Sequence, residues 1–122
     1  MATVEAVLVV PLVLVPVLVG VVVFGRLAHT RLVLDAAAAA GARQAAVVGG
    51  DASIVRMRIA TELADGGLDA TTASVTVTPS VADWGEPIRV RVVVQAEARI
   101  PFLGAWSLPV SAEFVTRSEV TR

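Results

Sequence analysis

The chain has 122 residues, a length that fits a single domain. Ten arginines and eleven acidic residues give a formal net charge of -1, which argues against a nucleic-acid binder, because such binders gain affinity by neutralising phosphates. The absence of cysteine excludes a disulfide scaffold and a cysteine-based zinc site, and an apolar content of 56% excludes disorder over most of the chain.

The first element is an apolar run of 20 residues without a charge, Ala6 to Gly25, which lies between Glu5 and Arg26. A bilayer core about 30 Å thick needs roughly 20 helical residues, so the run is long enough to cross one. Its valines favour strands in water, but only a helix satisfies every backbone group of a single segment in lipid. The sequence therefore predicts an apolar helical tail over residues 1–26, in a membrane or a filament core.

Two simpler explanations of this tail differ from a filament core. A secretory signal peptide has a basic start and an apolar stretch of about 7–15 residues, whereas here an acidic residue precedes a longer run. A plain membrane anchor explains the length of the run and the flanking Arg26, but it does not explain Glu5, because a carboxylate at the end of an apolar helix is costly in lipid unless it is paired or interfacial. Pro11 and Pro16 each remove a backbone donor and predict a kink or a local loosening of the helix.

An alanine-rich helical continuation is expected over residues 27–65, with a possible bend at 49–51. The Ala36–Ala40 block has the highest helix propensity available, and small side chains allow close helix contacts. We expect the zone from Ala36 to Ala46 to supply such contacts between subunits.

Beyond the bend, a second short helix is predicted from Ile54 to Ala64. Asp51 or Ser53 is the expected N-cap, and Gly66-Gly67 is the expected end.

The pattern changes to period two in the last part of the chain, residues 72–122. Alternation of apolar and polar side chains predicts three strands, which need a helix to cover their apolar face. The predicted strands are Ser74–Thr78, Ile88–Ile100 and Val110–Thr116, joined by loops at Pro79–Pro87 and Pro101–Pro109. The expected fold class is α+β: a long N-terminal hydrophobic helix, a short helix and a small antiparallel sheet of about three strands.

The sequence shows no catalytic, cofactor-binding or metal-binding constellation, so an enzyme is not expected. His29 is the only histidine and has no second histidine to complete a metal set. Trp84 and Trp106 both fall in predicted loops, where we expect core or subunit contacts rather than ligand binding.

Glu5 has two open explanations. In staggered helices, its carboxylate neutralises the N-terminal amine of Met1 in a neighbouring chain and fixes the axial register, since buried charges are costly unless paired. Alternatively, it is a glutamate in the first turn of a helix, favoured there by the helix dipole at the headgroup level.

The N-terminal segment MATVEAVLVVPLVLVPVLVGVVVFGRLAHTRLVLDAAAAAGARQAA resembles the TadE-like pilins of the tight-adherence branch of type IV pilus systems. The resemblance is carried by Glu5 with Pro11 six residues later, the apolar run, and the closing Phe24-Gly25-Arg26. It continues through an alanine-rich helix that contains Asp35 and Arg43. The ending VRVVVQAEARIPFLGAWSLPVSAEFVTRSEV is also similar to the family's strand, loop and final strand.

This resemblance implies a structural subunit of an extracellular type IV pilus-like filament. It implies a prepilin whose leader a prepilin peptidase removes, so that Glu5 becomes mature residue five, and a subunit that an assembly platform extracts from the cytoplasmic membrane. Its partners would be copies of itself, and its assembly residues Met1, Glu5, Pro11, Gly20 and Gly25. The alternative is a single-pass membrane-anchored minor pilin, or a binding module that uses its sheet or the Trp84 loop.

Overall fold

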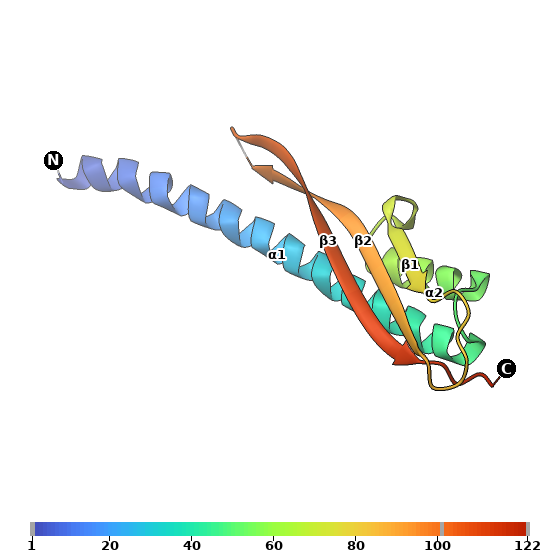
Figure 1. Cartoon of the computed structure of the whole chain (residues 1–122). Coiled ribbons are helices and arrows are strands. Elements are labelled where there is room, and N and C mark those ends of the chain that lie inside the picture. Colours follow the sequence, from blue (N-terminus) through green and yellow to red (C-terminus); the bar gives the residue numbers. More distant parts are fainter. Residues whose placement is uncertain (1, 101, 122) are drawn as a thin grey trace.

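The structure, a computed structural model, describes residues 2–100 and 102–121. It has the predicted α+β fold: a long helix, a short helix and a three-stranded antiparallel sheet (Figure 1). The elements are α1 (Ala2–Val48), α2 (Ser53–Asp65), the 3₁₀ helix η1 (Ala70–Thr72), β1 (Ser74–Thr78), β2 (Pro87–Ile100) and β3 (Gly104–Arg117).

Helix α1 has 47 residues and is about 70 Å long at 1.5 Å per residue. It continues through Pro11 and Pro16 and curves gradually along its length (Figure 1). Each proline removes one backbone donor, a loss that long apolar helices tolerate. Gly49, with a φ of 79°, follows the last helical residue and turns the chain toward α2.

Helix α2 lies beside α1 and presents Val55, Ile59 and Leu63 to it, a spacing of four residues that keeps all three on one face. The predicted N-cap was wrong. Ala52 occupies that position and makes no side-chain cap hydrogen bond. Asp51 instead binds the Arg56 guanidinium, with Oδ2 2.8 Å from Nη2 and Oδ1 3.1 Å from Nε, so its carboxylate is engaged away from the helix end.

The sheet has the order β1-β2-β3 and packs on the second half of α1, which covers its apolar face as expected. Strand β1 pairs with β2 only from Arg89 to Val93, whereas β3 pairs with β2 along its whole length. The buried core lies between the sheet, α1 and α2. Its fully buried large side chains are Leu34, Val55, Ile59, Leu63, Ile88, Val90 and Val92.

Strand β3 is much longer than predicted. It begins at Gly104, within the segment expected to be a loop, so Trp106 lies on a strand. Proline suggested a loop at position 109, but β3 is an edge strand, and Pro109 pairs with Gln95 there without breaking the ladder. The β2–β3 hairpin consequently extends beyond β1 toward the N-terminal half of α1 (Figure 1).

Candidate assembly surface

The first half of α1 carries a continuous apolar surface that the other described elements leave largely uncovered. Its most apolar 18-residue window is 0% buried, and the helix is long and apolar enough to cross a membrane. The exposed large side chains from Val4 to Phe24 each keep between 50% and 75% of their area accessible. Apolar surface of this extent on a folded protein marks a contact with lipid or with another protein.

Full burial begins only in the second half of the helix. Val33 is half-buried and Leu34 is fully buried, and the contact continues along an alanine-rich face. Ala37, Ala38 and Ala42 are all buried inside the chain's own core. The small side chains that we expected to contact other subunits therefore pack, at these positions, against the sheet and α2 of the same molecule.

Glu5 lies exposed in the first turn of α1, at the end of the helix farthest from the sheet (Figure 1). This position is favourable for a carboxylate, because the helix dipole is positive there. Met1, its predicted partner, lies outside the described residues. The role of Glu5 in axial register therefore stays a prediction.

Pro11, Gly20 and Gly25 are also exposed. They lie in the first half of α1, residues 2–25, which we call its bare half. A Cβ atom added at Gly20 or Gly25 would meet nothing within 4 Å, so no packing within the chain requires glycine at either position. The structure places these residues with Glu5 on one helix, and their predicted part in assembly stays a prediction.

The two tryptophans lie in different places and neither belongs to the core. Trp84 is 70% exposed in the loop before β2, and Trp106 is 55% exposed on β3. The expectation of a core contact is therefore wrong for both, and a subunit contact remains a prediction. Trp84 precedes the Pro87 end of β2, whereas Trp106 pairs with residue 98 near the other end of the strand.

Several polar residues of the folded part have structural partners. His29 Nε2 lies 3.0 Å from the carbonyl oxygen of Gly66 and so connects α1 to the end of α2. The hydrogen bond from Arg56 to Asp51 raises the pKa of the Arg56 guanidinium. Asp69 accepts from the backbone and hydroxyl of Thr71, and these hydrogen bonds lower the pKa of its carboxyl. Among residues 2–100 and 102–121, no group of three metal-binding side chains is brought together.

Sequence reasoning missed one apolar surface, at the end of the β2–β3 hairpin. Phe102, Leu103 and Leu108 are exposed there together with Trp106, and Ile100 is half-buried. A signal was present in the sequence, because no charged residue occurs between Arg99 and Glu113. This signal was not recognised because the segment was predicted to be a loop, and apolar residues in a loop suggested that their side chains fill the core.

A long, half-bare helix with a small sheet packed on its other half defines an α+β layout like that of pilins. A family model described as TadE-like protein matches residues 1–43, and the resemblance read from the sequence is thereby confirmed over this segment. The matched segment covers the bare half of α1 and most of its packed half. No curated protein and no solved structure matches the chain.

Proposed function

We propose that this protein is a non-enzymatic structural subunit of a type IV pilus-like filament of the tight-adherence class, assembled through the bare half of α1. The match to the TadE-like family supports an association with such pili. One structural observation carries the proposal: α1 is a single helix whose first half is apolar and mostly exposed, while its second half packs in the core of the folded domain.

The energetics of this helix favour an assembly or a membrane over water. At about 25 cal/mol per Å², removing roughly 1,500 Å² of apolar surface from water is worth tens of kcal/mol before entropy costs. A membrane supplies this burial before assembly, and the helices of neighbouring subunits supply it in a filament. The proposed route therefore runs from the cytoplasmic membrane to an extracellular filament, with a prepilin peptidase and an assembly platform as partners.

Glu5 is the residue that separates a filament subunit from a passive anchor. In an apolar filament core its carboxylate needs a positive partner, because an unpaired buried charge costs several kcal/mol. The amine of Met1 in a neighbouring copy is the partner we propose. An anchor in a bilayer places Glu5 at the headgroups, where its removal costs little.

The test is Glu5→Ala in the native host, with electron microscopy and mass spectrometry of the sheared surface fraction. We expect at least a roughly tenfold loss of this chain from filaments, while its amount in the membrane stays unchanged. Glu86→Ala, which removes an exposed carboxylate from the loop before β2, is the control and should assemble normally.

Normal incorporation of the Glu5→Ala protein would contradict the proposed role of Glu5. A wild-type chain that stays in the membrane pellet, or is only a trace component of filaments, would identify an anchored minor pilin instead. The observation in favour of that second candidate is Arg26, which directly follows a run long enough to span a bilayer.

A further inference from the structure

The β2–β3 hairpin has a covered half and an uncovered half. Near β1, its inner face is buried on α1, and Ile88, Val90 and Val92 are all 0% exposed. Strand β1 ends its pairing with β2 at Val93, and the hairpin continues from there with β2 and β3 paired only to each other.

The uncovered half continues the apolar face of the core. Paired residues in an antiparallel ladder lie on the same side of the sheet. Val92 pairs with Ala112 and Val94 with Val110, and the same alternation continues to Leu108 and Trp106. These last two side chains are 44% and 55% exposed, although they lie on the side of the sheet that is buried further along.

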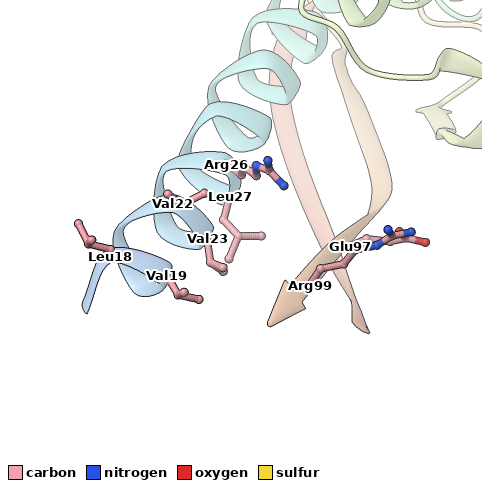
Figure 2. Close-up of a pocket in the computed structure, with 8 residues that line it drawn as sticks. All are labelled: Leu18, Val19, Val22, Val23, Arg26, Leu27, Glu97 and Arg99. Carbon is pink, nitrogen blue, oxygen red and sulfur yellow. The ribbon is translucent and has the colours of Figure 1, made fainter. Parts of the chain in front are cut away.

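On the hairpin and on α1, charge ends at the level of one shared hollow. Glu97 and Arg99 of β2 line one hollow with Arg26 of α1 and with the apolar side chains that precede it, such as Val22 (Figure 2). In this view Glu97 and Arg99 lie together and point away from α1, and their closest nitrogen and oxygen are 3.9 Å apart. Beyond this level α1 has no charge from Gly25 back to Ala6.

The tip of the hairpin lies beside the membrane-competent part of α1. Ile100, Phe102 and Leu103 line an apolar groove, and the opposite wall comes from α1. The helix residues of this wall are Val15, Pro16, Val19, Gly20, Val23, Phe24 and Leu27. Phe102 has a positive φ of 71° and a fully exposed ring, so the turn presents this side chain outward.

We propose that the uncovered half of the hairpin is a second membrane-contact element, and that acyl chains of the adjacent leaflet fill the groove between its tip and α1. When Ala6–Gly25 crosses a bilayer, the groove residues of α1 lie below the headgroups, and the tip beside them lies at the same depth. Glu97, Arg99 and Arg26 then lie together at the polar boundary. The proposal depends on α1 crossing a membrane and holds for a filament subunit and for an anchored minor pilin.

We infer lipid as the occupant because α1 and the hairpin both change from charged to apolar at the level of the hollow that they share. Trp106 lies near that level, where tryptophan is enriched in membrane proteins. Phe102 and Leu103 share the groove with Val15 and Pro16, the middle of the apolar run, so the tip reaches into the hydrocarbon of the leaflet. Open strand edges are costly in hydrocarbon, and this cost is limited because only the last residues of the hairpin extend beyond Glu97 and Arg99.

The test measures tryptophan quenching by lipids brominated on their acyl chains, with the full chain in phosphatidylcholine–phosphatidylglycerol vesicles at low protein density. Trp84→Phe leaves Trp106 as the single tryptophan, and Trp106→Phe leaves Trp84 as the matched reporter on the loop before β2. We expect brominated lipid to lower Trp106 emission by about twofold or more, most strongly with bromine near the headgroup, and to leave Trp84 emission unchanged.

The double variant Phe102→Asp with Leu103→Asp, in the Trp84→Phe chain, should abolish the quenching of Trp106 while α1 still holds the protein in the vesicles. Ile54→Asp with Met57→Asp, which adds the same charges to an exposed face of α2, should leave the quenching intact. The proposal is overturned if Trp106 is not quenched, or if the Phe102/Leu103 variant is quenched as strongly as its parent. Protection of Trp106 that appears only at high protein density would still support the lipid contact of the single chain and would show that a second copy displaces lipid from this surface when the protein is crowded.

Discussion

Gly41 is the residue on which the contact between the two helices depends. A Cβ atom at this position would lie 2.5 and 2.6 Å from Cγ1 and Cδ1 of Ile59, a fully buried side chain with little room to move. Gly41→Ala gains about 1 kcal/mol in helix propensity, but overpacking a core costs about 1–3 kcal/mol. We therefore expect a net loss of unfolding free energy, measured by chemical denaturation of the full chain in detergent micelles.

The reason for this loss can be tested with a second substitution. Ile59→Ala removes Cγ1 and Cδ1, the two atoms that the new methyl group would meet, so the double variant should be more stable than the sum of the two single effects predicts. Additive effects, or a Gly41→Ala protein more stable than the wild type, would show that Ile59 does not constrain this position.

At the scale of elements, α2 is held by one apolar face. Leu63 is 1% exposed within this face, whereas Met57 is 67% exposed on the opposite side of the helix. Leu63→Ala should lower the unfolding free energy by about 2–5 kcal/mol, since it leaves a cavity between α2 and α1. Met57→Ala removes a side chain of similar size from the surface and is expected to change stability by less than about 0.5 kcal/mol. Equal effects of the two substitutions in the same denaturation measurement would contradict this arrangement.

The elements also show which parts of the fold were predictable from the sequence. The uninterrupted apolar run and the period-two alternation in β2 are strong sequence signals, and each predicted the observed type of element. The start of β3 was missed because Pro109 and Gly104 were taken as loop residues, although an edge strand accommodates proline. The cap of α2 was missed because Asp51 has a stronger charged partner in Arg56 than the helix end.

The candidate site was predictable only in part, and for a physical reason. The positions of the charged residues alone locate the bare half of α1, since a run of 20 uncharged apolar residues predicts a membrane-competent helix. It cannot show that the hairpin tip lies beside this half, because that proximity depends on the register between β2 and β3 and on how far the sheet extends along α1. Trp106 was assigned to the wrong environment for the same reason.

At the scale of the whole molecule, one part of the chain buries its apolar side chains within its own fold, whereas the other part needs a partner for that burial. The core cluster begins at Leu34, with Val33 packed against it, and no described residue before Val33 contributes to it. The apolar helix before Arg26 instead depends on lipid or on other subunits for its burial. Removing it should therefore leave the stability of the remaining structure nearly intact.

We expect a chain that begins at Arg26 to fold and to remain monomeric in water without detergent. Its buried core is unchanged, and the loss removes the largest exposed apolar surface, so that only the smaller one at the end of the hairpin remains. Circular dichroism should show a cooperative thermal transition, and light scattering after size exclusion should give the monomer mass. The full chain, prepared in the same way, is the control and should require detergent or lipid. A truncated chain without a cooperative transition would mean that residues before Arg26 stabilise the sheet through contacts that their exposure in the full chain does not indicate.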